Sequence, residues 1–255
     1  LTMRVSSGEL LAQLKQSFEA FGASQGEYES AASSVLGLER WGFNGLGLIE
    51  GALSRLETDP RRPPHVVFES TDLLIDCFGG SALFGLVPSV ERLYVNAWRN
   101  NGAQATVKNC REPAFILPLL VKVCERGCNA AVQWWIDGEP QLVHRVRIEG
   151  GGGVRVSSQV WEGADVVACD MHVYMSRDAQ DLDAVESNAI GPSFKLVQQR
   201  GHAEHLACFQ RSTVSAIEIN PLLWQRLEDI GRKMLVPATV QSRLGAGADA
   251  PPQKR

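Results

Sequence analysis

The sequence predicts an α/β protein in which an N-terminal helical lobe packs on a mixed β-sheet with covering helices. Three observations indicate this class. Apolar residues recur at helical spacing up to about residue 56. From residue 65, short β-rich runs alternate with helical segments, and after residue 135 the composition is mainly β-rich. Apolar residues make up 44% of the 255-residue chain, which suffices for an ordinary core.

These patterns divide the chain into three parts. We expect a helical lobe at 3–60, an α/β core at 61–236, and a Gly-, Ala- and Pro-rich tail at 237–255 that is extended or partly disordered.

The lobe is expected to contain three helices. The first lies within residues 5–22, where the apolar side chains share one face, and Gly22 can end it. The second runs from residue 25 or 26 to about 39, and the third covers 49–56. The glycines of 42–47 predict a loop or a close backbone approach between them. The prolines of the segment 59–64 stop the third helix.

The core begins with two short strands, at 65–70 and 72–77, followed by a helix at 82–100. Residues 105–135 then read as a strand, a polar loop, an apolar helix and a second strand. This βαβ-like order implies at least one parallel, buried strand pair.

The β-rich part after residue 135 starts with a hairpin at 136–150, with Asp137 and Gly138 as turn residues. Further strands are expected within 154–176. Residues 205–220 are expected to form one long strand or a pair. Asn220 and Pro221 then predict a helix that runs to about Lys233, because asparagine caps a helix and proline suits its first position.

Composition excludes several classes of function. The net charge is −4 and no long basic run occurs, which argues against nucleic-acid binding. No apolar run approaches the ~20 residues that span a membrane. No signal peptide is visible, so we expect a cytoplasmic protein with six free cysteines. No metal site is expected, since Cys124 and Cys128 fit a packed helix face without partner ligands.

The loop Asn109-Cys110-Arg111-Glu112-Pro113 holds the densest group of reactive side chains. Glu112 could act as a general acid or base, or simply as a carboxylate favoured at a helix N-terminus. Cys110 could be a nucleophile whose thiolate is favoured by the helix N-terminus and Arg111, or a small packed thiol.

Three other features are candidates. His172 shares a strand face with Asp170 and Tyr174, which could be a polar site face or a solvent face. Ser242 and Arg243, in the glycine-rich tail, could wrap an anionic ligand or a neighbouring subunit, or belong to a plain flexible tail. Of the adjoining Trp134 and Trp135, one is expected to face inward and one outward.

Several stretches resemble the malate/L-lactate/sulfolactate dehydrogenase family that is unrelated to the Rossmann dehydrogenases. GLERWGFNGLGL (37–48) resembles the end of that family's helical lobe, and LLIDCFGGSALFG (73–85) its strand and turn. ATVKNCREPAFILPLLVKVCERGCNAAVQ (105–133) resembles its strand-loop-helix-strand, whose loop reads roughly VRNSNHFG. The resemblance implies the family's fold and its dimeric assembly.

The departures from this family concern its chemistry. Its first motif has the form RGHDSHG, and the histidine has no counterpart among residues 41–45. The histidine of its second motif falls at Glu112, and the chain is shorter than full-length members. Hydride transfer from a hydroxy acid needs a base and cations for the carboxylate. Arg40 and Arg111 remain as carboxylate anchors.

A second resemblance extends over the whole length. The chain is similar to a bacterial family catalogued only as a domain of unknown function, whose most specific sign is the ending VPATVQSRLGAGA at 236–248. This family implies no activity.

We therefore expect a small-molecule-binding protein on a malate/lactate dehydrogenase-like scaffold that has lost hydride transfer. Its ligand would be a small organic acid, and its assembly a homodimer. The alternatives are an atypical NAD(P)-dependent oxidoreductase of 2-oxo, 2-hydroxy or imino acids, and a non-catalytic interaction subunit. No dinucleotide motif supports NAD(P), since Gly150–Gly153 lies between strands. The candidate catalytic residues are Glu112 and His172, and the candidate ligand-binding residues are Arg40, Asn44, Asn109, Cys110, Arg111, Ser242 and Arg243.

Overall fold

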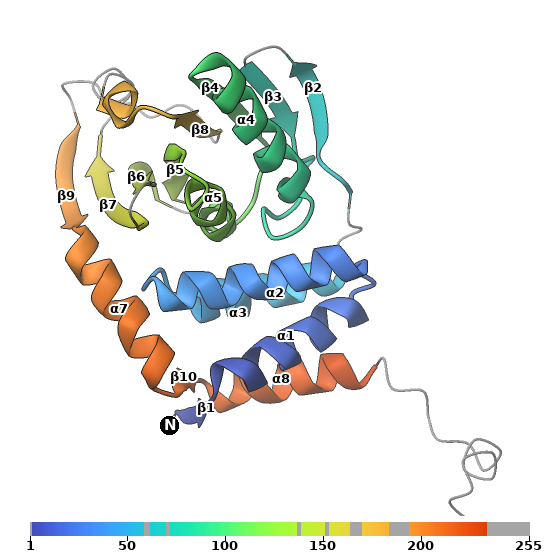
Figure 1. The fold of residues 1–255 in the computed structure, drawn as a ribbon. Coiled ribbons are helices and arrows are strands. Elements are labelled where there is room, and N and C mark those ends of the chain that lie inside the picture. Colours follow the sequence, from blue (N-terminus) through green and yellow to red (C-terminus); the bar gives the residue numbers. More distant parts are fainter. Residues whose placement is uncertain are drawn as a thin grey trace, which may run out of the picture.

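The chain folds into a lobe of helices that lies against one side of a large sheet (Figure 1). This computed structural model describes residues 2–58, 62–69, 72–136, 139–150, 153–163, 170–183 and 194–233. The predicted class is confirmed, since a mixed eight-stranded sheet carries covering helices. No helix among the described residues is long and apolar enough to cross a bilayer.

The N-terminal helices are α1 (Ser7–Ala20), α2 (Gln25–Arg40) and α3 (Gly45–Thr58). Ser6 starts α1 with a capping box: its hydroxyl accepts from the Glu9 N–H at 3.1 Å, and the Glu9 carboxylate accepts from the Ser6 N–H at 2.7 Å. Gly22 follows α1 with a φ of 78°, a left-handed conformation that glycine adopts without a steric penalty. The first two helices therefore match the prediction within about two residues.

The glycine cluster between α2 and α3 is a close backbone approach as well as a turn. A Cβ on Gly45 would lie 2.2 Å from the Val35 carbonyl oxygen and 2.9 Å from the Glu39 nitrogen. Glu39 also accepts a hydrogen bond from the Leu46 N–H at 3.0 Å. Because these contacts begin the helix at Gly45, α3 starts earlier than the predicted residue 49.

The sheet has the strand order β2-β3-β4-β8-β5-β6-β7-β9. Strands β3 and β4 are parallel and are joined by α4 (Leu86–Asn100), so the expected parallel pair exists. The two strands of the 105–135 stretch, β4 and β5, do not pair with each other. Strand β8 lies between them and is antiparallel to both. The strands in sheet order are β2 (His65–Glu69), β3 (Asp72–Asp76), β4 (Ala103–Lys108), β8 (Met171–Ser176), β5 (Asn129–Ile136), β6 (Glu139–Glu149), β7 (Arg155–Glu162) and β9 (Lys195–Arg200).

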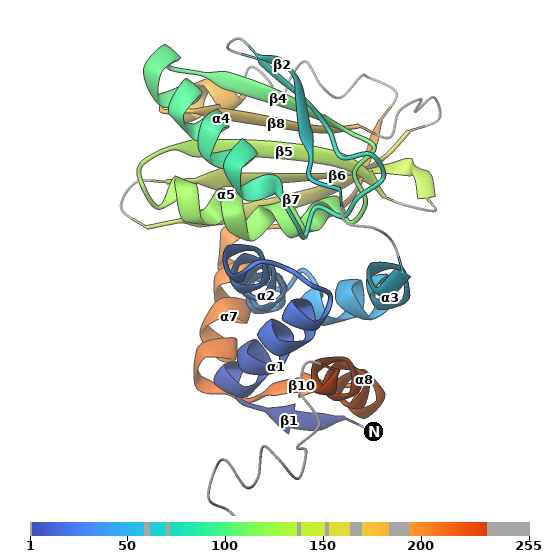
Figure 2. The same ribbon diagram turned by 90° about the vertical axis from the view of Figure 1, so that its right-hand side faces the viewer.

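Helices α4 and α5 (Leu117–Cys124) lie on the same face of the sheet (Figure 2). A short 3-10 turn, η1 (Pro113–Ile116), leads into α5. Strands β5 and β6 pair antiparallel, which confirms the predicted hairpin. Its expected turn residues, Asp137 and Gly138, lie outside the described residues.

The expectation of a strand or strand pair at 205–220 is wrong. Residues His202–Val214 form helix α7, and only Ile217–Ile219 form a strand, β10. The Glu204 carboxylate accepts from the Gly201 N–H at 2.7 Å and so caps the helix. His205 and Phe209, four residues apart, share one helix face and contact the lobe. This tertiary contact outweighs the strand preference of the Ser, Thr and Val residues.

The end of the described chain returns to the lobe. Strand β10 pairs antiparallel with β1 (Met3–Val5), and α8 (Pro221–Arg232) packs on α1. The Ser17 hydroxyl of α1 donates to the Leu227 carbonyl of α8 at 2.8 Å. Asn220 caps α8 as predicted, because its side chain accepts from the Leu222 N–H at 3.1 Å.

Aromatic and histidine rings join the lobe, α7 and the sheet. Phe43 stacks on His205, and His144 of β6 lies against Trp134 with ring centroids 4.7 Å apart. The buried His205 imidazole contacts the Trp41 carbonyl at 2.7 Å and the Ser158 hydroxyl at 3.0 Å. Trp134 is buried, whereas Trp135 faces the opposite side of the sheet beside His172, so the expectation for the two tryptophans is confirmed.

Burial of His144 should make the stability of the protein depend on pH. Burial lowers the pKa of His144 from 6.5 to about 4, with a smaller contribution from His205. In the unfolded chain His144 therefore takes up a proton below pH 6.5, whereas in the folded chain it stays neutral down to about pH 4. Stability from this group is complete above pH 6.5 and falls as the pH drops towards 4. Between pH 7 and 5 the loss should be on the order of 2 kcal/mol.

Urea unfolding of wild type and His144→Phe at pH 7 and 5 measures this loss. The variant should lose less stability than wild type on acidification, while His65→Gln, which alters an exposed imidazole, should behave as wild type. Equal losses in wild type and His144→Phe would contradict the assignment.

Candidate functional site

The candidate site lies at the carboxyl ends of the parallel strands β3 and β4. Because these strands run in the same direction, the loops that follow them emerge at the same edge of the sheet. The first loop begins at Cys77, and the second is the reactive segment 109–112. In α/β sheets, crevices outside the carboxyl ends of strands are the usual place for ligands.

A ladder of backbone hydrogen bonds holds the two loops side by side. The Cys77 N–H donates to the Lys108 carbonyl at 3.0 Å, and the Gly79 N–H donates to the Asn109 carbonyl at 2.8 Å. The Arg111 N–H then donates to the Gly80 carbonyl at 2.9 Å. The two loops therefore form one unit instead of moving independently.

Several residues of this unit have left-handed backbone conformations. The φ angles are 51° at Phe78, 51° at Asn109 and 45° at Glu112. Such angles are costly for residues other than glycine and cluster at binding and active sites. The Asp76 carboxylate supports this geometry, since it accepts from the Asn109 amide at 2.9 Å and from the Phe78 N–H at 2.8 Å. These two hydrogen bonds, the Asn109 bond first, lower the pKa of Asp76.

A cleft of about 280 Å³ opens between this unit and α3, and we call it the arginine cleft. Its volume suits a small ligand. Three of its lining residues are arginines, and none of the described residues that line it is acidic. The lining residues are Arg55, Leu56, Arg62, Pro64, Cys77, Phe78, Gly79, Gly80, Ser81, Phe84 and Arg111.

An ion pair between Arg55 of α3 and Glu112 joins the lobe to the sheet. The side chains are 26% and 12% exposed, so the pair is shielded from solvent. Glu112 is thus held as a carboxylate partner of a cleft arginine, and its second oxygen is buried without a hydrogen bond. An acid or base role for Glu112 would require this pair to open.

Two thiols meet beside the arginine cleft. Cys77 is 1% exposed, and Cys110 is half-buried. The Cys110 thiol forms a side-chain hydrogen bond with Cys77, and this bond lowers the pKa of Cys77. None of the five described cysteines forms a disulfide, and Cys169 lies outside the described residues.

The sequence-predicted residues separate into groups. Of the four consecutive residues 109–112, only Arg111 lines the cleft. Asn109 is bonded to Asp76, and Glu112 pairs with the lining residue Arg55. Arg40 and Asn44 are absent from the lining; Asn44 instead caps α3, accepting from the Gly47 N–H at 3.2 Å.

His172 lies in the middle of the sheet and does not line the cleft. Its Nδ1 contacts the Thr106 hydroxyl at 3.3 Å, and burial lowers its pKa. Ser242 and Arg243 lie outside the described residues.

Sequence reasoning missed Arg55, Arg62, Cys77 and Ser81. A signal was present, because two strands that are parallel neighbours place the residues after their carboxyl ends at one edge. Recognising β3 and β4 as that pair would have added the 77–81 loop to the site. Arg55 and Arg62 needed the tertiary structure, which brings α3 and the segment after it beside the two loops.

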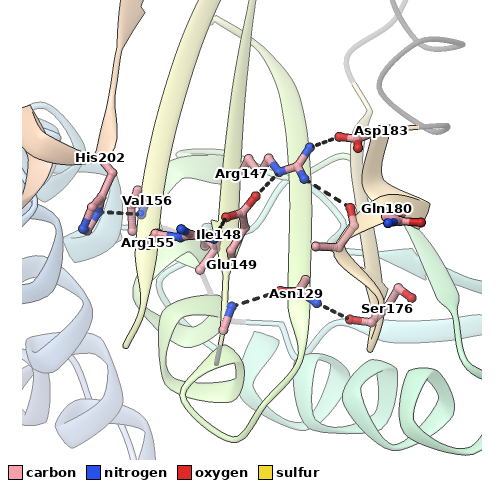
Figure 3. A network of polar contacts seen from close by, with 12 residues as sticks. Asn129, Arg147, Ile148, Glu149, Arg155, Val156, Ser176, Gln180, Asp183 and His202 are labelled. Carbon is pink, nitrogen blue, oxygen red and sulfur yellow. Dashed lines mark hydrogen bonds and ion pairs between the residues drawn. The ribbon is translucent and has the colours of Figure 1, made fainter. Parts of the chain in front are cut away.

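Other polar clusters support the structure. Figure 3 shows Arg147 of β6 between the carboxylates of Glu149 and Asp183. Nearby, the Asn129 amide donates to the Ser176 carbonyl at 3.3 Å, and its oxygen accepts from the Gly150 N–H at 3.0 Å. Hydrogen bonds and ion pairs with neighbouring strands and turns therefore satisfy each of these polar groups. Within the described ranges no group of three or more His, Cys, Asp or Glu residues could hold a metal ion.

Comparisons with known proteins agree with the fold. Residues 5–99 match the model of a family described as "Protein of unknown function (DUF3726)". No curated protein matches the chain.

Solved structures are similar over nearly the whole chain. A dehydrogenase from Sinorhizobium meliloti has a TM-score of 0.68 at 12% identity, covering 91% of this chain and 100% of that one. A putative malate/lactate dehydrogenase from E. coli has 0.68 at 9% identity, covering 96% and 99%. A delta1-piperideine-2-carboxylate reductase from Pseudomonas syringae pvar. tomato has 0.64 at 14% identity, covering 90% and 100%.

At these identities the similarity shows the fold alone. The C-terminal motif at 236–248 lies outside both the family match and the described residues. Residues 5–99 thus match a family of unknown function, and the chain has the fold of the malate/lactate dehydrogenase-like proteins.

Proposed function

We propose that the arginine cleft binds a small organic acid and that the protein has lost hydride transfer. The observation that carries this proposal is the set of three arginines around a cleft whose described lining has no acidic residue. Arg55 is paired with Glu112, so Arg62 and Arg111 are the arginines that we expect to hold the acid. A guanidinium binds a carboxylate through two parallel hydrogen bonds, which gives both affinity and orientation. Backbone groups of Gly79, Gly80 and Ser81 lie in the same lining and can add neutral contacts.

The position of Glu112 supports the loss of hydride transfer. Glu112 falls at the position of the histidine in the dehydrogenase loop motif that residues 105–133 resemble. Its carboxylate forms an ion pair with Arg55. A neighbouring cation favours the ionised carboxylate and so opposes the proton transfers that a general acid or base makes. No imidazole occurs among the described lining residues, and His172 lies elsewhere in the sheet.

Two alternatives come from the same fold. An atypical NAD(P)-dependent oxidoreductase of 2-oxo, 2-hydroxy or imino acids would use the cleft as its substrate site. An interaction subunit would need a partner chain to complete the site. The homodimer and the cytoplasmic location also stay predictions, and the mass of the purified protein in solution would decide the assembly.

Thermal shift with carboxylates tests the proposal. Malate, oxaloacetate, 2-oxoglutarate and malonate should each be titrated, and at least one should raise the Tm, because a ligand that binds only the folded state stabilises it. Arg111→Ala should weaken that ligand about tenfold or more, since a charged hydrogen bond contributes about 1.5–3 kcal/mol. NADPH and NADH should produce no shift.

Arg232→Ala is the matched control. Arg232 is an exposed arginine on α8, where it pairs with Glu228 and Asp229, away from the cleft. This variant should bind the acid as wild type does. The absence of any carboxylate effect, or equal weakening in both variants, would overturn acid binding. Oxidation of NADPH with an oxo or imino acid would overturn the loss of hydride transfer and favour the oxidoreductase.

A further inference from the structure

The two thiols beside the arginine cleft are placed for a covalent bond. Cys77 is the first residue after β3, and Cys110 is the second residue after β4. Asp76 pairs with Lys108 in the parallel register, so Cys110 lies diagonally opposite Cys77. The ladder ends at this pair, and the positive φ of Asn109, 51°, lies between Lys108 and Cys110. This turn of the backbone breaks the alternation of faces that would otherwise point the two side chains to opposite sides of the sheet.

The backbone keeps these residues in place. Cys77 is bonded through its N–H to the Lys108 carbonyl at 3.0 Å. On the other side, the Arg111 N–H donates to the Gly80 carbonyl at 2.9 Å. A side-chain hydrogen bond links the Cys110 and Cys77 thiols. The hydrogen-bonded loops therefore hold the two thiols as neighbours.

The chemical environment also distinguishes this pair from the other buried thiols. The hydrogen bond from Cys110 lowers the pKa of Cys77, whereas burial raises the pKa values of Cys124 and Cys128. The thiolate is the species that attacks an oxidant. Cys77 is one of the residues that line the arginine cleft, and Cys110 is half-buried, so the cleft brings a small oxidant beside the pair.

We propose that Cys77 and Cys110 form a reversible intramolecular disulfide, with a hydroperoxide as the oxidant and a dithiol as the reductant. The Cys77 thiolate attacks one oxygen of hydrogen peroxide, the O–O bond breaks, and a sulfenic acid and one water form. The Cys110 sulfur then attacks the sulfenic sulfur, the S–S bond forms, and the second water leaves. Two electrons pass from the two thiols to the peroxide, and a dithiol returns them by exchange.

This modification site is independent of acid binding, because it requires only the two sulfurs and access for the oxidant. Neither the fold resemblance nor the family match assigns a role to these thiols.

Peptide mapping of the full chain tests the inference. The protein is treated with a stoichiometric amount of hydrogen peroxide, its remaining thiols are alkylated, and it is digested without reductant. The expected result is a Cys77–Cys110 linked peptide, the loss of two reactive thiols, and full recovery of both after dithiothreitol. Cys110→Ser should abolish the linked peptide.

Cys208→Ser is the matched control, because Cys208 is also half-buried and its sulfur lies 3.4 Å from an arginine nitrogen, that of Arg211. This variant should form the Cys77–Cys110 link as wild type does. Recovery of Cys77 and Cys110 as alkylated free thiols from oxidised wild type, or as separate over-oxidised residues, would overturn the inference. Because wild type alone decides it, poor folding of a variant leaves the test intact.

Discussion

Gly45→Ala should destabilise the protein by about 3 kcal/mol, at the upper end of the usual cost of overpacking. The new methyl group would lie 2.2 Å from the Val35 carbonyl oxygen and 2.9 Å from the Glu39 nitrogen. Both contacts are with backbone atoms of α2, so no side chain can rotate away and the two helices must separate. Urea unfolding at pH 7 measures the loss as a lower midpoint with an unchanged slope.

Gly51→Ala provides the control within the same helix. Gly51 is exposed in α3, and a Cβ there would meet nothing within 4 Å. Alanine should therefore stabilise the helix by up to about 1 kcal/mol through its better helix propensity. The two substitutions are chemically identical, so opposite signs would isolate the contact between α2 and α3. If both variants were stabilised, the close approach of the helices would be contradicted.

Glu112→Gln should cost about 3 kcal/mol, because removing one partner of a shielded ion pair leaves the other charge uncompensated. Arg55 and Glu112 are 26% and 12% exposed, and the pair connects α3 with the loop that follows β4. Its loss should weaken the attachment of the lobe to the sheet as well as the overall stability. Urea unfolding gives the first quantity, and amide hydrogen exchange in the 109–112 loop reports the second.

Glu91→Gln is the matched control for this pair. Arg126 and Glu91 also make an ion pair, at 2.8 Å, but the side chains are 43% and 44% exposed. Such exposed pairs contribute under about 1 kcal/mol. A double-mutant cycle with Arg55→Met should show strong coupling to Glu112. If Glu112→Gln and Glu91→Gln lowered the free energy of unfolding by similar amounts, a solvent-shielded ion pair between Arg55 and Glu112 would be contradicted.

The local signals of the chain determined most of its elements. The capping box at Ser6, the Asn220-Pro221 start of α8 and the apolar runs of β3 and β4 depend on neighbours within a few residues. Such short-range preferences are visible in sequence. The exception is 205–220, where a packing contact with Trp41 and Phe43 decided for helix.

The candidate site could be predicted only in part. Residues 109–112 are consecutive, so their polar character stands out in the sequence, and Arg111 of this loop lines the cleft. Arg40 and Asn44 belong to the stretch GLERWGFNGLGL, which resembles the end of the dehydrogenase family's helical lobe, yet neither residue lines the cleft. Arg55, Arg62 and Cys77 come from three separate segments, and no local pattern connects them with the 109–112 loop.

The sequence by itself thus determined the α/β class, the three N-terminal helices and the polar loop that carries the cleft residue Arg111. Tertiary structure alone decided that β8 separates β4 from β5, that α8 packs on α1, and that Arg55 reaches Glu112. The physical reason is the range of the interactions. Capping and periodicity act over a few residues, whereas strand order and ion pairing between segments depend on the free energy of the whole packed core.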